Sequence, residues 1–162
     1  MDLYRFLSDN MIPYDRFDHP PVYTVDDVHR LTPDLPGART KNLFLRDKKG
    51  TRHFLVVMPA DKRIALKALP RVLASTKVSF GSSQRLMKHL GVAPGAVSLL
   101  AILNDKANAV ELIIDVELWE LNAFQFHPLI NTSTLVLPKT GVERFLMALG
   151  HSFQIAKIPS PM

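Results

Sequence analysis

A turn sequence between two apolar segments constrains the fold of this chain more than any other feature. Residues 43–46 and 53–58 are rich in apolar and branched side chains, and the polar residues 47–50, which end in Gly50, lie between them. This pattern predicts a β-hairpin, which is an antiparallel strand pair. Further apolar segments predict strands at residues 14–18, 97–103, 109–114, 134–137 and 152–158, with the continuous run 97–103 as a central strand.

Helical segments alternate irregularly with these strands. The first helix is predicted at residues 2–10, and a short second one follows a capping box of Thr24 and Asp27. A third is predicted to begin at Asp61 and to be stopped by Pro70, and a fourth to begin at Ser82 or Ser83 and to end at Gly91. The last begins with a capping box of Thr140 and Glu143 and ends at Gly150. Hairpins combined with irregular alternation favour an α/β fold with a mixed sheet and flanking helices over a doubly wound parallel sheet.

Length and composition set further limits. The chain has 162 residues and is 47% hydrophobic, so it can bury one ordinary core, and no repeat or Gly/Ser-rich linker divides it. We therefore expect one domain over residues 1–162. No cysteine is present, which excludes disulfides, thiolate zinc sites and a cysteine nucleophile. No histidine pair has metal-site spacing and no apolar run could span a bilayer. We expect no metal, no cofactor, no membrane contact and a cytoplasmic location.

Positive charge is concentrated in the middle of the chain. Residues 39–88 contain thirteen Lys and Arg against two acids, although the net charge of the whole chain is only +5. Such a stretch is typical of a protein that binds a polyanion, provided that its side chains share a face. The alternative is a set of solvated helix and strand faces, and composition alone does not separate the two.

Three short segments contain candidate functional residues. Lys41 and Asn42 follow a turn with Gly37 and enter an apolar strand, so an ammonium and an amide lie near the end of a sheet. An ammonium is a compact charge suited to a phosphate or a carboxylate. The structural alternative for Lys41 is a side chain that extends from a strand end to solvent.

The second segment contains Gly91, Pro94 and Gly95, and Ser98 follows it. Glycines let a backbone approach a ligand closely, and the N–H groups of such a loop can stabilise a developing oxyanion. The structural alternative is a helix end followed by a tight turn. The third segment places His127 and Asn131 in a proline-containing connection between apolar segments, a composition common in ligand-binding loops. A lone histidine can equally be structural.

Taken together and in order, these segments resemble the YbaK/ProX family of aminoacyl-tRNA editing domains. The resemblance covers nearly the whole chain and includes the sequences around His19, Lys41, Gly91–Gly95, Asn104 and His127. It implies an α/β fold with a mixed, barrel-like sheet. It implies that Lys41 is the essential lysine, which holds the terminal phosphate or the aminoacyl end of tRNA. The remaining implied substrate-binding residues are Asn42, Gly91, Pro94, Gly95, Ser98, His127 and Asn131.

The resemblance also implies a reaction. It predicts hydrolysis of the ester of mischarged tRNA for proline, most closely the alanyl branch of the family, with the acceptor end of tRNA as partner and a prolyl-tRNA synthetase as a further one. An activated ester needs positioned water and oxyanion stabilisation rather than a strong nucleophile. Two alternatives stay open, namely a cysteinyl-tRNA deacylase of the same family and a non-catalytic nucleic-acid-binding module.

Overall fold

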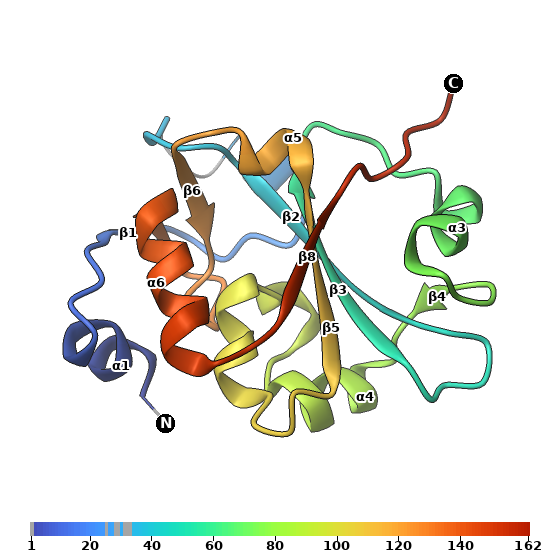
Figure 1. Cartoon of the computed structure of the whole chain (residues 1–162). Helices are drawn as coiled ribbons and strands as arrows, with labels where there is room; N and C mark the ends of the chain where they lie inside the picture. Colours follow the sequence, from blue (N-terminus) through green and yellow to red (C-terminus); the bar gives the residue numbers. More distant parts are fainter. Residues whose placement is uncertain (1, 25, 28–29, 31–33) are drawn as a thin grey trace.

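The structure is a computed structural model, and it describes residues 2–24, 26, 27, 30 and 34–162 (Figure 1). Its larger sheet has five strands in the order β4-β2-β3-β5-β8. The strands are β2 (Thr40–Arg46), β3 (His53–Pro59), β4 (Ser79–Phe80), β5 (Val110–Asp115) and β8 (Phe153–Ala156). β2 pairs antiparallel with β3 and with β4, whereas β3–β5 and β5–β8 are parallel. The hairpin and the mixed sheet are thus confirmed.

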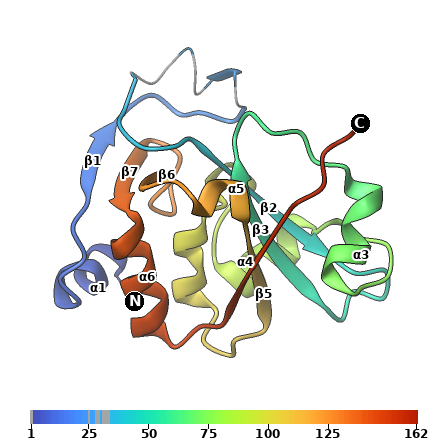
Figure 2. The same cartoon turned by 45° about the horizontal axis from the view of Figure 1, so that its top comes forward.

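A second, smaller sheet lies apart from the first (Figure 2). It is antiparallel in the order β1-β7-β6, and its strands are β1 (Asp15–Asp18), β6 (Ala123–Phe126) and β7 (Ser133–Pro138). An isolated parallel bridge between Ala38 and Phe124 connects it to the chain that enters β2. The Gln125 N–H donates to the Ala38 carbonyl at 2.9 Å beside this bridge.

The barrel-like sheet is the part of the fold prediction that is wrong. In the part of the chain that the structure describes, neither sheet closes on itself, and the outer strands of the larger one, β4 and β8, do not pair with the smaller one. Closure would require a continuous ladder, but the single bridge at Ala38 is too short to make one. The fold is therefore a mixed α/β arrangement of two open sheets.

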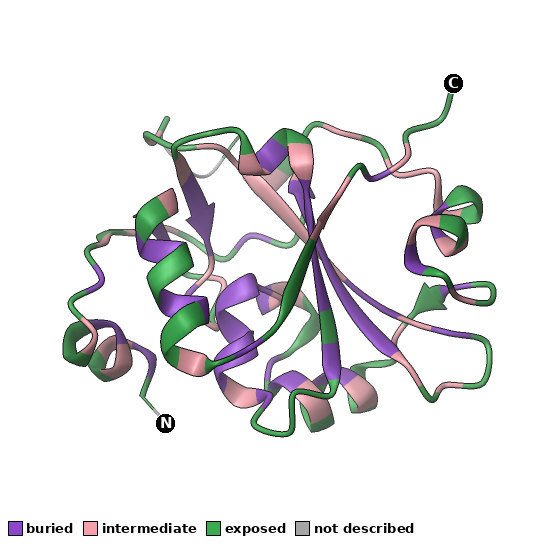
Figure 3. Cartoon of the chain, viewed as in Figure 1, coloured by how far each residue is buried: buried purple, intermediate pink, exposed green. Residues whose placement is uncertain are grey.

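Helices cover both faces of the larger sheet. They are α1 (Leu3–Asp9), η1 (Leu66–Ala68), α3 (Leu69–Leu73), α4 (Ser83–Leu90), η2 (Pro94–Ala96), η3 (Leu99–Asn104), α5 (Val116–Trp119) and α6 (Lys139–Leu149), where η denotes a 3₁₀-helix. The main core joins α1, α4, η3 and α6 to one face of β2 and β3, and a second core packs η1 and α3 on the other face. β3, η3 and β7 are the most continuously buried segments (Figure 3).

The continuous apolar run is not a strand. Residues 97–103 were predicted to form a central strand, but Leu99–Asn104 is the 3₁₀-helix η3, whose residues 99–103 are all buried. The Ser98 side chain caps it by accepting the Leu100 N–H at 3.1 Å. A segment buried on every side carries no periodic pattern, so its sequence does not distinguish a strand from a buried helix.

Two helix boundaries also differ from the prediction. Pro70 does not end a helix that starts at Asp61; it lies in the first turn of α3, where a missing N–H costs no hydrogen bond. α6 begins directly after Pro138 without a side-chain cap, so Thr140 and Glu143 lie inside it. Gly91 and Gly150 do end helices as predicted, each with φ of 66°. The helix predicted after Thr24 lies partly outside the described residues.

None of the described helices is long and apolar enough to cross a membrane.

Candidate active site

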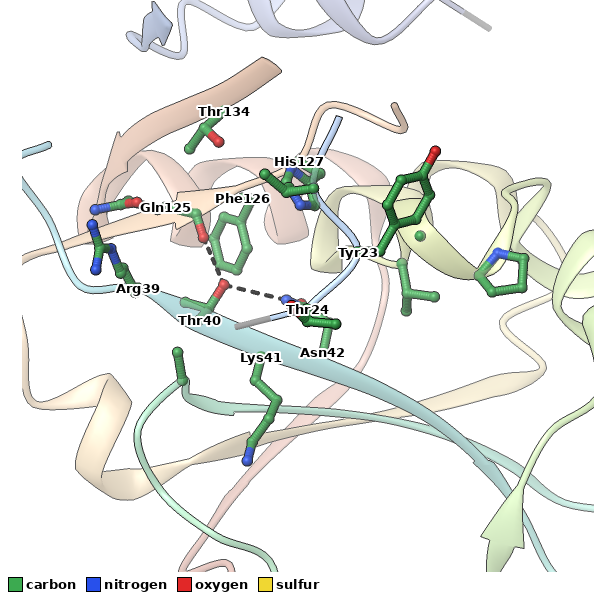
Figure 4. A pocket seen from close by; sticks show the side chains of 15 residues that line it. Tyr23, Thr24, Arg39, Thr40, Lys41, Asn42, Gln125, Phe126, His127 and Thr134 are labelled. Atoms are coloured by element: carbon green, nitrogen blue, oxygen red, sulfur yellow. Dashed lines mark hydrogen bonds between the residues drawn. The ribbon is translucent and has the colours of Figure 1, made fainter. Parts of the chain in front are cut away.

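A cavity of about 200 Å³ opens where the two sheets meet (Figure 4). The start of β2 forms one wall, and the end of β6 with His127 forms another. η2 and the extended residues 22–24 complete the rim. The cavity brings together five of the predicted site residues, which come from three separate segments of the sequence: Lys41, Asn42, Pro94, Gly95 and His127.

The β2 wall presents two polar side chains in a fixed orientation. Asn42 Oδ1 accepts the Leu99 N–H at 2.9 Å, so the Asn42 amide nitrogen faces the other way and donates to Thr40 Oγ1 at 3.2 Å. Thr40 in turn donates to the Gln125 carbonyl at 2.6 Å. One hydrogen of the Asn42 amide group stays available for a ligand, since the amide has two. Both side chains face β6 in Figure 4.

Lys41 lies between these two residues and points the other way. Side chains alternate along a strand, so its ammonium leaves the opposite face of β2, where it donates to the Lys62 carbonyl (Figure 4). Partial burial lowers the pKa of Lys41, and the nearby Arg63 lowers it further, while Asp61 opposes the shift. Lys41 thus borders the cavity, whereas its ammonium lies on the face of β2 that points away from Asn42.

His127 is held in one tautomer at the opposite wall. Its Nδ1 lies 3.0 Å from the Ser133 carbonyl, which can only accept, so Nδ1 carries the hydrogen and Nε2 of the neutral ring has a free lone pair. Burial lowers the pKa of His127; the Ser133 hydrogen bond opposes this shift and His19 adds to it. The ring is therefore held neutral at pH 7, with Nε2 as its available proton acceptor.

His19 supports this wall from behind. Its ring centroid lies 6.1 Å from that of His127, and its two nitrogens lie 2.8 Å from the Pro20 carbonyl and 2.8 Å from Thr134 Oγ1. The carbonyl accepts the hydrogen of Nδ1, and Nε2 shares a hydrogen bond with the Thr134 hydroxyl. Thr134 also lines the cavity.

Residues 22–24 pass over the cavity and are tied to the loop after β6. The Asn131 side chain donates to the Val22 carbonyl at 3.2 Å, and the Val22 N–H donates to the Asn131 carbonyl at 3.3 Å. Tyr23, which is 72% exposed, stands at the mouth beside Gly95. A Cβ added at Gly95 would lie 3.2 Å from the Tyr23 ring, so this position favours glycine. Asn131 thus lies beside the cavity and fixes its rim.

Besides Asn131, which lies at the rim, two further predicted site residues are outside the cavity lining. Gly91 ends α4, and a Cβ placed there would lie 3.0 Å from the Asn104 side chain. Ser98 is fully buried as the cap of η3. The sequence analysis missed Tyr23, Thr40, Gln125, Phe126 and Thr134, all of which line the cavity. Strand alternation could have indicated Thr40 beside Asn42, but β6 was not predicted.

The chemistry that this cavity can perform follows from its groups. It offers an unprotonated imidazole nitrogen at one wall and an amide donor at the other. Among residues 2–24, 26, 27, 30 and 34–162, no three His, Asp or Glu side chains gather as a metal site would require. The arrangement suits proton transfer and stabilisation of an oxyanion.

Comparisons with known proteins identify the family. The family model of the aminoacyl-tRNA editing domain matches residues 19–145. The prolyl-tRNA editing protein ProX of Acetoanaerobium sticklandii is 38% identical over 94% of this chain and 93% of its own length. The prolyl-tRNA synthetase associated domain-containing protein 1 of Danio rerio is 33% identical over 93% of this chain and 83% of its own length.

A solved structure shares the fold. It is the crystal structure of a proposed trans-editing enzyme for prolyl-tRNA synthetase, with a TM-score of 0.66 and 13% sequence identity over 91% of this chain and 87% of that one. The resemblance drawn from the sequence motifs is confirmed by the family match and by the identity to ProX. The chain belongs to the aminoacyl-tRNA editing domain family.

Proposed function

We propose that this protein is a deacylase that hydrolyses the ester of mischarged tRNA for proline, with alanyl-tRNA as its preferred substrate. The observation that carries the proposal is the neutral His127, whose Nε2 is available in a cavity that also contains the oriented amide of Asn42. Family membership and the editing activity named for ProX support it. A prolyl-tRNA synthetase stays a predicted partner.

In the proposed reaction a water molecule attacks the carbonyl carbon of the aminoacyl ester. His127 Nε2 takes a proton from this water, and the free hydrogen of the Asn42 amide stabilises the oxyanion that forms. The bond between the carbonyl carbon and the ribose oxygen then breaks, and the ribose oxygen receives the proton. The products are a free amino acid and a tRNA with a free terminal hydroxyl.

We place Lys41 at the phosphate of the terminal nucleotide rather than at the ester. Its ammonium lies on the side of β2 opposite to Asn42 and His127. In this proposal the anionic backbone of a substrate whose aminoacyl group occupies the cavity passes over the start of β2. A partly buried ammonium binds such a phosphate as a point charge.

A panel of charged tRNAs tests the proposed function. We expect the purified protein to release alanine from tRNA for proline, to release cysteine more slowly and to spare proline, because the proline ring is too large for the site. Release of each labelled amino acid is measured against buffer alone. Faster release of cysteine than of alanine would assign the cysteinyl branch. No release of any amino acid, with tRNA still bound, would identify a binding module instead.

The role of His127 predicts a pH dependence. The reaction needs the unprotonated ring, and burial lowers the pKa of His127 below its usual 6.5. The turnover number kcat should therefore decline only as pH falls through the lowered pKa of His127, as the ring becomes protonated. The measurement is kcat at saturating alanyl-tRNA between pH 5 and 7.5, corrected for release in buffer, because kcat does not contain the affinity for RNA. His127→Gln should be slow throughout and lack this decline. An unchanged profile in the variant would exclude His127 as the proton acceptor.

A further inference from the structure

A second cavity lies at the opposite end of β2 from the candidate active site. It has a volume of about 520 Å³, and it is lined by residues of the turn that joins β2 to β3 and of the helix α4. Four of its lining residues are basic or imidazole side chains, namely His53, Arg85, Lys88 and His89, and we call it the histidine cleft. None of the described residues that line it is acidic.

The histidine cleft contains hydrogen-bond donors without partners. Arg85 Nη1 donates to the Gly50 carbonyl at 2.9 Å and lies 3.0 Å from His53 Nε2. A guanidinium only donates, so His53 Nε2 accepts and Nδ1 carries the hydrogen. No described residue hydrogen-bonds to His53 Nδ1, which solvent can reach although the residue is only 5% exposed. Within the described chain His89 has no hydrogen-bond partner at either nitrogen.

The surroundings of the two imidazoles disfavour the protonation of either ring. Their ring centroids lie 4.1 Å apart, and the Phe44 ring stacks on His53 at 5.8 Å. Burial lowers the pKa of His53, and His89, Arg85 and Lys88 lower it further. Burial likewise lowers the pKa of His89, with Lys88 and Arg85 adding to the shift. Both rings are therefore neutral at pH 7.5.

The acids nearest to the pair are occupied elsewhere. Asp47 raises the pKa of His53, but its carboxylate accepts backbone N–H groups of the β2–β3 turn at 2.9 and 3.0 Å. Asp105 raises the pKa of His89, but it pairs with the buried His151 at 2.9 Å. Arg46 adds a further cation beside Gly50. The cleft thus has positive charge that no described ion pair neutralises.

The histidine cleft and the active-site cavity lie toward opposite ends of β2. β2 has seven residues, which at about 3.3 Å each separate the two sites by about 20 Å. Between the two sites, α4 and η3 cover the face of β2 that carries Asn42, because they belong to the main core. A polynucleotide whose 3′ end occupies the cavity therefore reaches the cleft over the outer surface of α4, where Lys88 is exposed.

We propose that the histidine cleft binds a backbone phosphate of the RNA substrate and takes up protons as it does so. RNA as the source of the phosphate rests on the proposed function. A phosphate accepts hydrogen bonds from the Arg85 fork and from Lys88, and its charge opposes the burial and the repulsion that keep the imidazoles neutral. His53 donates to it through Nδ1 as a neutral ring, because Nε2 keeps accepting from Arg85, and His89 donates to it once protonated. If the only role of Arg85 were its hydrogen bond to the Gly50 carbonyl of the β2–β3 turn, the lack of hydrogen-bond partners at Lys88 and His89 among the described residues would have no explanation.

Binding of an uncharged acceptor hairpin of tRNA for proline tests this site without any hydrolysis. At constant ionic strength, affinity should rise between about threefold and tenfold as pH falls from 7.5 to 5.5, because the bound state holds more protons. His89→Gln should remove most of this rise, and the loss of its side chain breaks no hydrogen bond that the structure shows. Lys88→Gln should weaken binding at every pH and keep the rise.

Matched controls lie on the other face of the larger sheet. Lys67→Gln on η1 and Arg71→Gln on α3 remove the same charges from exposed positions and should change neither affinity nor its pH dependence. His127→Gln should keep the rise, which separates the cleft from the imidazole of the active-site cavity. A titration with sulfate tests whether a free anion also enters the histidine cleft. The charge of sulfate is constant over this pH range, and its binding is measured by NMR as a shift of the His89 imidazole resonances.

The outcomes separate this proposal from the proposed function. An equal pH dependence in the wild type and in His89→Gln overturns the RNA site, even if sulfate shifts the His89 resonances, because the cleft would then accept only a free anion. If alanyl-tRNA is still hydrolysed, the proposed function survives that result. Hydrolysis is refuted separately, by the panel of charged tRNAs.

Discussion

Replacing Lys41 with alanine is expected to lower kcat/KM for alanyl-tRNA about a hundredfold. The loss of one charge-assisted contact to a phosphate, partly shielded from water, costs about 3 kcal/mol, which corresponds to that factor in rate. The ammonium lies on the opposite face of β2 from Asn42 and His127. The loss should therefore fall mainly on KM, because a contact to the backbone is made equally in the ground state and in the transition state. Steady-state kinetics with alanyl-tRNA measure both constants.

Two controls separate this effect from a folding defect. The hydrogen bond from Lys41 to the Lys62 carbonyl joins partly exposed groups, so water can replace it and the melting temperature should change little. Lys67→Ala removes an exposed ammonium from η1 and should leave kcat/KM unchanged. A Lys41→Ala protein with near-native kcat/KM would mean that Lys41 is a solvated strand end. A loss in kcat at constant KM would place the ammonium at the ester instead.

The parts of the fold that the sequence predicts well are those in which local chemistry decides the structure. The β2–β3 hairpin follows from a turn ending in Gly50, and α4 follows from Ser82 at its start and Gly91 at its end. Each of these signals acts within a few residues. η3 was missed because burial on every side removes the periodicity on which such predictions depend.

The candidate site follows the same rule. The sequence singled out five residues that line the cavity, because each lies in a segment whose local composition is unusual for a purely structural segment: Lys41, Asn42, Pro94, Gly95 and His127. Gln125 and Thr40 contact each other across 85 positions of sequence, and no local signal reports such a pairing. The direction of the Lys41 side chain likewise depends on how β2 faces β6, which only the tertiary structure gives.

The second large effect is expected on stability, and it concerns the buried ion pair of Lys62, the residue whose carbonyl accepts the Lys41 hydrogen bond. Lys62 Nζ lies 2.8 Å from Asp115 Oδ2, and Asp115 is fully buried at the end of β5. Burial alone would lower the pKa of Lys62, but Asp115 and Glu117 outweigh it and raise the pKa. Lys62→Met should lower the free energy of unfolding by about 3–5 kcal/mol, because it leaves a buried carboxylate without its cation. Chemical denaturation at pH 7 measures this.

Glu117 provides the matched comparison, because it binds the same ammonium from the surface. Its carboxylate lies 2.5 Å from Lys62 Nζ, but its side chain is 50% exposed, so water replaces the contact when Glu117→Gln removes the charge. The loss of stability should be far smaller than for Lys62→Met. The double variant Lys62→Met, Asp115→Asn should recover much of the loss, since the unpaired buried charge is gone and Oδ1 still accepts the Glu117 N–H that caps α5. Two outcomes would contradict this prediction: equal losses of unfolding free energy in Lys62→Met and Glu117→Gln, or no recovery of it in the double variant. Either would show that solvent reaches Asp115 and that burial does not set the strength of the ion pair.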